Sequence, residues 1–459
     1  MKKISIVFIT ILLLIVAILP VIGNRFMQNR VNDALMQANA YGLKLQSMKT
    51  DATYLDTKKH LEFVIEDATE FIGYINSHAH KQLPTLTASK LNGTLIGLDV
   101  AYSNIPFTKS IQLDIYPLKL SKTLQDSLES EDVHFYNKLS AFLAAKGVLC
   151  HIDYNLLNSQ FKGSLKDIDE RYKLHNGSDV TLQLLGTKFR GEGDLLSAKS
   201  FHSQIKTVRL EATKQREYAL LALENFQAKN SFLSFENYSS AVALQKIQFL
   251  IDGTKKDVNI SVSNFKTSSD ALTKKERVTI DAKTAFDALN ISAKKVALAV
   301  KKFHSDISVK GLAQKPFEAI STILNKTTNI KAMANKKEMQ EAMLNLLAKG
   351  LQITIKDISV ADVVIDKNEH YGASKLNLDM VVNADENLSK KVKIAPMELL
   401  ADLKLDANTS VSQRVYDKLV QSVPMASLLS LYAKKEQKDV VFNLQVHNSK
   451  IYLNGKQIQ

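Results

Sequence analysis

The chain has 459 residues, of which 45% are hydrophobic and 23% charged, with 16 glycines, 7 prolines and one cysteine. This composition is typical of globular proteins and excludes a disordered, collagen-like or multi-span membrane protein, while the lone Cys150 excludes an internal disulfide framework. The formal net charge of +13 comes almost entirely from lysine. Because nucleic-acid recognition favours arginine, we expect no nucleic-acid partner; solvated faces or attraction to an anionic membrane surface explain the charge.

The N-terminus carries an uncharged, strongly apolar run from Ile4 to Ile22, preceded by Lys2 and Lys3. Its 19 residues predict a helix that nearly spans a hydrocarbon core of about 30 Å. A cleaved signal peptide is the alternative, since its apolar region usually has about 7–15 residues. We favour a cytoplasmic tip and transmembrane anchor at 1–23, with a periplasmic body in a bacterial inner membrane. The anchor residues are Ile4, Phe8, Leu12, Ile15, Leu19 and Ile22.

After the anchor, apolar residues at spacings of three and four predict a juxtamembrane helix over 24–42. From 43 to 310 the pattern is mostly period two, which predicts a β-rich extracytoplasmic region; Val258, Ile260 and Val262 alternate strictly with polar residues. One helix interrupts this region at about 131–146. Ser130 is its expected N-cap and Gly147 its expected end.

Residues 311–459 predict a second helix–hairpin region, with helical patterns at 316–349 and 411–434 and a closing hairpin of 440–446 with 450–454. The segment 142–147 is echoed by 346–350, and strand patterns follow both, which suggests a duplicated helix–hairpin unit. The expected fold class is therefore α+β: mostly antiparallel β-sheets with about three amphipathic helices, after one N-terminal transmembrane helix.

The search for chemistry yields no catalytic, cofactor-binding or metal site. His78 and His80 are the only close histidine pair, and a polar loop explains them better than a metal site does. Common nucleotide-binding, hydrolase and metalloprotease motifs are missing, so we expect no enzyme and no cofactor. Cys150 lies in an apolar run and is expected to be a buried core residue. Three asparagines within an acidic-x-Asn-x-Ser/Thr context are candidate N-glycosylation sites: Asn259, Asn387 and Asn408, which follow Asp257, Asp385 and Asp406.

Short segments that carry a family resemblance lie at 36–40, 43–45, 145–147, 349–350 with 353–355, 372–378 and 448–456. Together they resemble the YdgA-like family of bacterial inner-membrane-anchored proteins of unknown function. The resemblance implies an inner-membrane anchor and a periplasmic body, and it supplies no catalytic residue.

Three classes of function remain open at this point. The first is a non-enzymatic cell-envelope protein that binds protein partners or acts as a scaffold, and it is our leading hypothesis. The second is a periplasmic module that binds lipid or another apolar ligand. The third is an envelope enzyme with dispersed catalytic residues. A continuous apolar groove would favour the second class, and a closed core with an exposed apolar patch would favour the first. The partner and the oligomeric state do not follow from the sequence.

Overall fold

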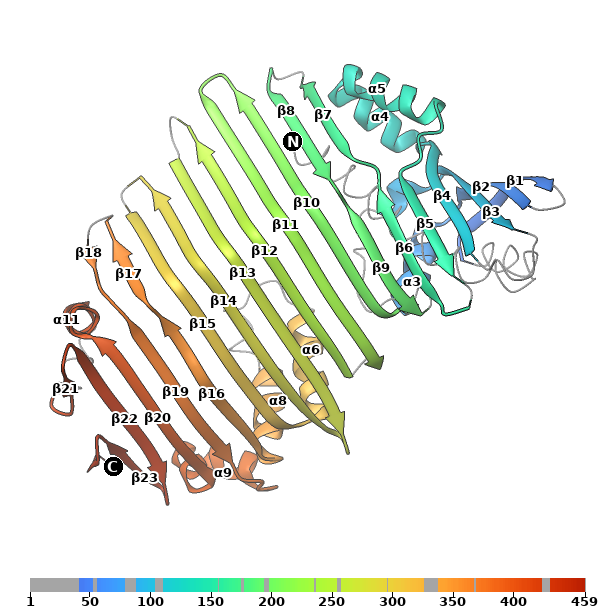
Figure 1. Cartoon of the computed structure of the whole chain (residues 1–459). Coiled ribbons are helices and arrows are strands. Elements are labelled where there is room, and N and C mark those ends of the chain that lie inside the picture. The colour runs from blue at the N-terminus through green and yellow to red at the C-terminus, as the bar shows by residue number, and fades with distance from the viewer. Residues whose placement is uncertain are drawn as a thin grey trace. The chain divides into compact units, whose positions relative to one another are not determined.

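The chain is built mainly of antiparallel strands, as the computed structural model in Figure 1 shows. Strands account for 63% and helices for 22% of the residues that the structure describes. The chain forms two compact units: unit 1 comprises residues 1–232 and 250–255, and unit 2 comprises residues 233–249 and 256–459. The structure describes residues 41–52, 56–78, 88–103, 110–155, 157–174, 177–193, 198–234, 237–253, 257–294, 296–325, 337–366, 369–422 and 430–458.

The strands of unit 1 follow one another in the order β1-β2-β3-β4-β5-β6-β9-β10-β11, and every pair is antiparallel. The remaining hairpin, β7–β8, joins the long strand β10 through β8, beyond the stretch that pairs with β9. The strands are β1 (Leu43–Ala52), β2 (Asp56–Ile65), β3 (Leu95–Ser103), β4 (Ser110–Lys119), β5 (Cys150–Asn155), β6 (Gln160–Leu165), β7 (Ile168–Lys173), β8 (Asp179–Leu185), β9 (Lys188–Gly193), β10 (Ala198–Lys214) and β11 (Glu217–Ser234).

One face of these strands forms the core of unit 1. In β5, Cys150, Ile152 and Tyr154 are buried and the intervening residues are partly exposed, which is the period-two pattern of a strand with one covered face. The helices of this unit contribute further buried residues, such as Phe71, Leu124 and Phe135. They are α3 (Ala68–His78), α4 (Lys122–Glu131) and α5 (Val133–Ala144), with the 3₁₀ turn η1 (Ala88–Leu91).

Unit 2 repeats this construction in the order β13-β14-β15-β16-β19-β20-β22-β23-β24. Strand β17 pairs with the other end of β15, β18 pairs with β17, and β21 pairs with β22. The strands are β12 (Asn237–Asp252), β13 (Asp257–Lys274), β14 (Arg277–Ala293), β15 (Val296–Ala313), β16 (Leu351–Val360), β17 (Asp362–Ile365), β18 (Glu369–His370), β19 (Ser374–Val382), β20 (Leu403–Ser412), β21 (Lys434–Glu436), β22 (Asp439–His447), β23 (Lys450–Leu453) and β24 (Lys456–Gln457).

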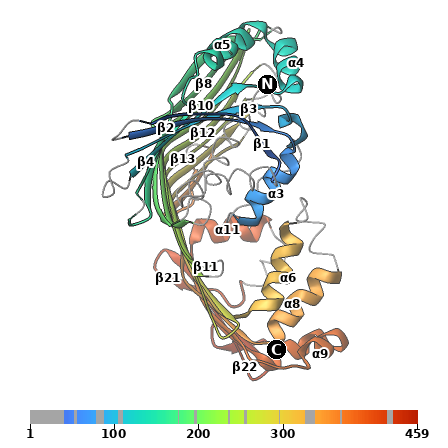
Figure 2. The same cartoon turned by 90° about the vertical axis from the view of Figure 1, so that its right-hand side faces the viewer.

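Two helices of unit 2, α6 and α8, lie against one face of its strands (Figure 2). Their side chains, including Phe317 and Ala348, cluster with Val278, Leu312 and Leu351 of the sheet. The helical elements are α6 (Gln314–Asn325), α8 (Lys337–Ala348), α9 (Leu388–Ile394), α10 (Leu399–Asp402) and α11 (Gln413–Ser422), with the 3₁₀ turn η2 (Pro396–Glu398).

Strand β14 changes side-chain parity once along its length. In β14 the exposed residues are odd-numbered up to Asp287 and even-numbered from Asn290 onward. Asn264 on β13 donates a hydrogen bond to Asp287 at 2.7 Å, and Asn264 has a positive φ of 51°. The pairing register of β13 with β14 is the same on both sides of this point. Phe286 and Leu289 therefore lie on the same face, although they are three residues apart.

The expected number of helices is wrong. The described residues contain eight α-helices, not about three. The helix expected at 131–146 is α5; Asp132, not Ser130, caps it by accepting hydrogen bonds from the backbone N–H groups of His134 and Phe135. The segment at 316–349 contains α6 and α8, in line with the second helical start expected near Asn335, and α11 (Gln413–Ser422) is the helix that the structure describes within 411–434, where a break was expected near Pro424.

Both helices of the expected duplication are followed by an antiparallel strand pair, but only the first pair is a simple hairpin. After α5, strands β5 and β6 form a hairpin. After α8, strand β16 pairs with β15 and β19, and β17 and β18 intervene before β19. The matching residues at the two helix ends are therefore followed by different strand connections.

The membrane-spanning helix expected from the sequence is not among the helices that the structure describes. In the part of the chain that the structure describes, no helix combines the length and the apolar content needed to cross a membrane. The anchor segment 4–22, with Ile4, Phe8, Leu12, Ile15, Leu19 and Ile22, lies outside the described residues, as does nearly all of the segment 24–42.

Candidate functional site

The residues singled out from the sequence do not come together in one place. His80 and the side chain of His78 lie outside the described residues. Asn259 and Asn408 lie within paired strands, whereas Asn387 is exposed in the turn before α9. Over the described ranges, no group of three or more His, Cys, Asp or Glu side chains is arranged to hold a metal ion. The site therefore has to be found from the structure.

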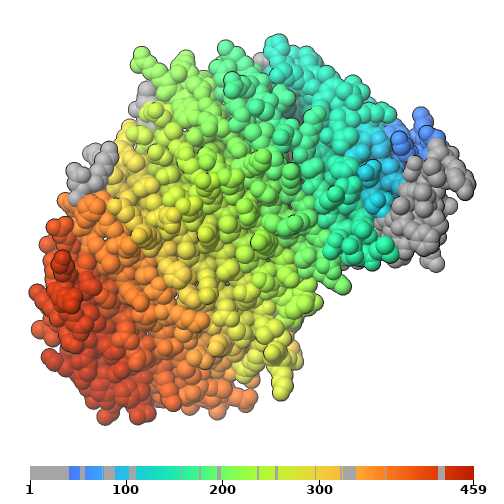
Figure 3. Space-filling model, viewed as in Figure 1, coloured from blue at the N-terminus to red at the C-terminus, as the bar shows by residue number. Residues whose placement is uncertain are grey.

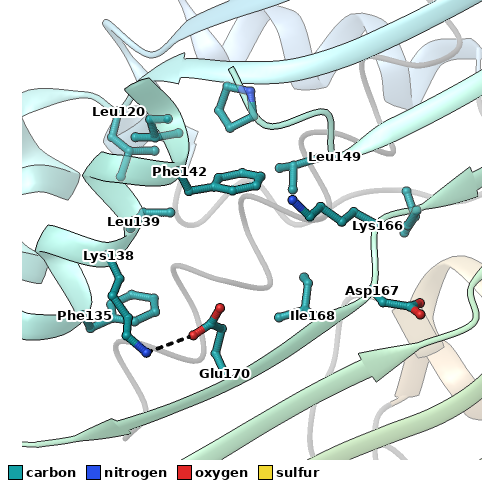
Figure 4. A pocket seen from close by; sticks show the side chains of 13 residues that line it. Leu120, Phe135, Lys138, Leu139, Phe142, Leu149, Lys166, Asp167, Ile168 and Glu170 are labelled. Atoms are coloured by element: carbon teal, nitrogen blue, oxygen red, sulfur yellow. Dashed lines mark hydrogen bonds and ion pairs between the residues drawn. The ribbon is translucent and has the colours of Figure 1, made fainter. Parts of the chain in front are cut away.

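An apolar pocket in unit 1 is the best-formed candidate (Figure 4). Its first wall is one face of α5, where Phe135, Leu139, Phe142 and Leu143 recur at helical spacing. Lys138 belongs to the same face, so this stripe places one cation among apolar side chains. Asp132 starts the helix by capping it, and so fixes the first turn that carries Phe135.

The opposite wall comes from segments before and after α5. Leu120 precedes α4, Leu149 follows α5, and Leu165 and Ile168 lie on either side of the turn between β6 and β7. The cavity volume is about 150 Å³. Leu120 is almost fully buried, whereas Lys138, Lys166 and Asp167 are exposed, so the pocket has an apolar floor and a charged rim.

Two lysines dominate the rim. The Lys138 Nζ atom lies 3.3 Å from Glu170 Oε2. The Lys166 Nζ atom lies 4.5 Å from the centroid of the Phe142 ring, within the range of a cation–π contact. The neighbouring Asp167 accepts a hydrogen bond of 2.6 Å from the backbone N–H of Gly186, which holds its carboxylate on the β8–β9 turn. Because Lys166 contacts the face of an aromatic ring, its positive charge is available to an anionic group above the pocket.

The end of α5 shapes the wall through two adjacent residues with different roles. Lys146 has a φ of 50°, and its N–H donates to the Leu143 carbonyl while the Gly147 N–H donates to the Phe142 carbonyl. This is the Schellman pattern, with lysine at the position that usually carries glycine. Gly147 is needed for space instead, because a Cβ there would collide with the Phe142 ring. Gly147 was expected to end the helix, but the residue with the left-handed conformation at the helix end is Lys146.

Behind the pocket, the buried groups are held in their neutral forms. The Tyr172 ring packs against Phe135 with centroids 4.9 Å apart, and burial together with Asp132 raises the pKa of Tyr172 to about 12. Cys150 is buried, as expected, and burial together with the charge of Asp114 raises the pKa of its thiol to about 12. These groups do not line the pocket; its lining offers apolar surface and charged side chains.

Sequence analysis identified α5 but not the pocket. The feature of the sequence that pointed to the pocket is a cation on the apolar stripe of an amphipathic helix, as at Lys138. The other wall comes from residues 117–120, 149 and 165–170, which only the fold brings to this helix.

Comparison with known proteins adds no relative. No family model matches the sequence, and no curated protein matches it. The resemblance to the YdgA-like family therefore stays a prediction.

Proposed function

We propose that the protein is a binding protein for a small apolar or amphiphilic molecule, and that the α5 pocket holds the apolar end of that molecule. The observation that carries this proposal is a cavity of about 150 Å³ with an apolar floor and two lysines at its rim. An apolar cavity of about this volume in another protein stays dry and binds benzene. The pocket therefore suits a single ring or the end of a hydrocarbon chain.

The expected affinity follows from the area that such a pocket can hide. Each buried methylene contributes about 0.8 kcal/mol, so four of them contribute about 3 kcal/mol. That alone corresponds to weak binding, and an anionic headgroup near Lys166 would add to it. An amphiphilic anion is accordingly the best match to both the floor and the rim. The scaffold role, the periplasmic location and the absence of enzymatic activity stay predictions.

The test is to fill the pocket. The chain has no tryptophan, so the Leu139→Trp variant carries a single fluorescent reporter inside the proposed site. Decanoate titrated into the full chain by calorimetry should bind the wild-type protein, and Leu139→Trp should weaken that binding at least tenfold. Leu157→Trp is the matched control, because Leu157 is 65% exposed and lies outside the lining.

Each outcome has a clear meaning. A blue-shifted emission from Leu139→Trp together with lost decanoate binding supports the proposal. Equal decanoate binding by wild type, Leu139→Trp and Leu157→Trp would place the ligand elsewhere and overturn it, as would the absence of binding to the wild-type chain.

A further inference from the structure

The face of unit 1 that points away from its core carries four basic side chains in one line. Lys162 on β6 is opposite Arg190 on β9, Arg190 is opposite His202 on β10, and His202 is opposite Lys229 on β11. We call Lys162, Arg190, His202 and Lys229 the basic row. Neighbouring strands are about 4.8 Å apart, so the four positions span roughly 14 Å. These strands are the green region of Figure 1, and Figure 3 shows the same region as a surface.

Such a row is unfavourable without a compensating anion. Like charges directly opposite each other on neighbouring strands destabilise a sheet. Asp153 stands at one end of the row, 3.5 Å from the Lys162 Nζ atom. Among the residues that the structure describes, no carboxylate lies within ion-pair distance of Arg190 or Lys229. The positive potential is therefore concentrated at the middle and far end of the row.

His202 lies within this positive potential, and one of its two ring nitrogens lacks a hydrogen-bond partner. The Arg190 Nε–H group donates to His202 Nδ1 at 3.3 Å, which leaves the proton of the neutral ring on Nε2. Nε2 is buried and has no partner among the described residues. Burial, followed by the charges of Arg190 and Lys229, lowers the pKa of His202. The row thus contains a buried N–H donor for which an acceptor oxygen is missing.

The surface beside the row is hollowed. A groove of about 990 Å³ is lined by all four basic residues, together with the carboxylates of Asp153 and Glu192. A second hollow, of about 450 Å³, shares Lys162, Arg190 and His202 and adds Lys188. Both hollows are lined by polar side chains near the basic row, and neither shares a lining residue with the apolar pocket.

We propose that the basic row binds a linear anion that carries several phosphate groups. Arg190 at the centre has the planar fork that recognises phosphate oxygens in pairs. Lys162 and Lys229 on either side supply point charges. The spacing of the strands fits an extended chain of anionic groups better than a single ion. The chemistry is that of a polyphosphate, whether free or attached to a nucleoside.

The test is calorimetric titration of the full chain at low salt with three probes: inorganic triphosphate, orthophosphate and adenosine triphosphate. We expect triphosphate to bind at least tenfold more tightly than orthophosphate. Adenosine triphosphate binding as tightly as triphosphate would show that the nucleoside is not recognised, and tighter binding would identify a nucleotide as the source. Arg190→Gln and Lys229→Gln should each weaken triphosphate binding about fivefold or more.

Controls separate this site from the net charge of the chain and from the apolar pocket. Lys214→Gln changes an exposed lysine on β10, the strand that carries His202, and should leave triphosphate binding unchanged. Triphosphate should also raise the pKa of His202, which NMR of its imidazole can follow. Equal weakening by Lys214→Gln and Arg190→Gln, equal affinity for triphosphate and orthophosphate, or no binding at all would overturn the proposal. Leu139→Trp should bind triphosphate normally, so failure of one site is distinguishable from failure of the other.

Discussion

Replacing Gly147 with alanine and Lys146 with glycine tests how the pocket wall is built. In Gly147→Ala, the new methyl group would lie 2.6 Å from Phe142 Cδ2 and would also collide with Cε2 and Cζ of that ring. The ring would have to move, and overpacking of this kind costs about 1–3 kcal/mol. Since Phe142 lines the pocket and carries the Lys166 contact, ligand binding should weaken as well.

Lys146→Gly should have the opposite sign. Lys146 has a φ of 50°, a left-handed conformation that costs an L-residue about 1–2 kcal/mol. Glycine removes that cost but gains flexibility in the unfolded chain, so the net stabilisation should be about 0.5–1 kcal/mol. Its side chain is exposed and does not line the pocket, so decanoate binding should not change.

Urea unfolding followed by circular dichroism, together with decanoate calorimetry, measures both effects. Gly73→Ala on α3 is the matched control, because a Cβ there meets nothing within 4 Å, and it should stabilise the helix by about 1 kcal/mol. If Lys146→Gly destabilised the protein as much as Gly147→Ala, the helix-ending roles would be assigned to the wrong residues. If Gly147→Ala left decanoate affinity intact, the packing of Phe142 would not shape the pocket.

Three further predictions use other groups. Because burial raises the pKa of Cys150 to about 12, Ellman's reagent should label the native chain far more slowly than the urea-unfolded chain; equally fast labelling would contradict its burial. The hydrogen bond to Asp114 raises the folded-state pKa of His151 above its unfolded value, so this stabilisation is complete below the unfolded pKa and is lost as pH rises through the folded pKa. Unfolding of His151→Gln should accordingly differ more from wild type at pH 5.5 than at pH 8.5, and a larger difference at pH 8.5 would refute the assignment. Lys166→Met should weaken the binding of decanoate but not of decanol. An equal loss for both would show that Lys166 does not interact with the headgroup.

Local patterns in the sequence predicted many strands correctly and several helices wrongly. The alternation of Val258, Ile260 and Val262 identified part of β13, and Asn448 and Ser449 were correctly placed in the turn of the closing hairpin, where both have positive φ. The helices α3, α4, α9 and α10 were missed because they are short and their apolar stripes are brief. Tertiary contacts, not propensity, stabilise helices of this length.

The long strands were hard to recognise for a different reason. The large apolar residues of β14 fall at even positions up to Phe286 and at odd positions from Leu289, so a strict period-two pattern breaks in the middle of one strand. The pocket and the basic row were beyond sequence reasoning altogether. The pocket lining runs from Pro117 to Glu170 and the basic row from Lys162 to Lys229, and only the fold brings these segments together.

The alternation in β6 and β9 ties the core and the basic row together. Phe161 and Phe189 pack across Gly191 and Gly163 of the neighbouring strand, where a Cβ would collide with their rings. Lys162 and Arg190 lie between these residues and point to the other face. A slip of one residue would place both cations in the core and both phenylalanines in solvent, so the aromatic–glycine pairs fix the register that lines up the basic row. Core packing therefore offsets the repulsion between like charges that lie opposite each other. As a result, the outer face can carry a charge pattern suited to an anion.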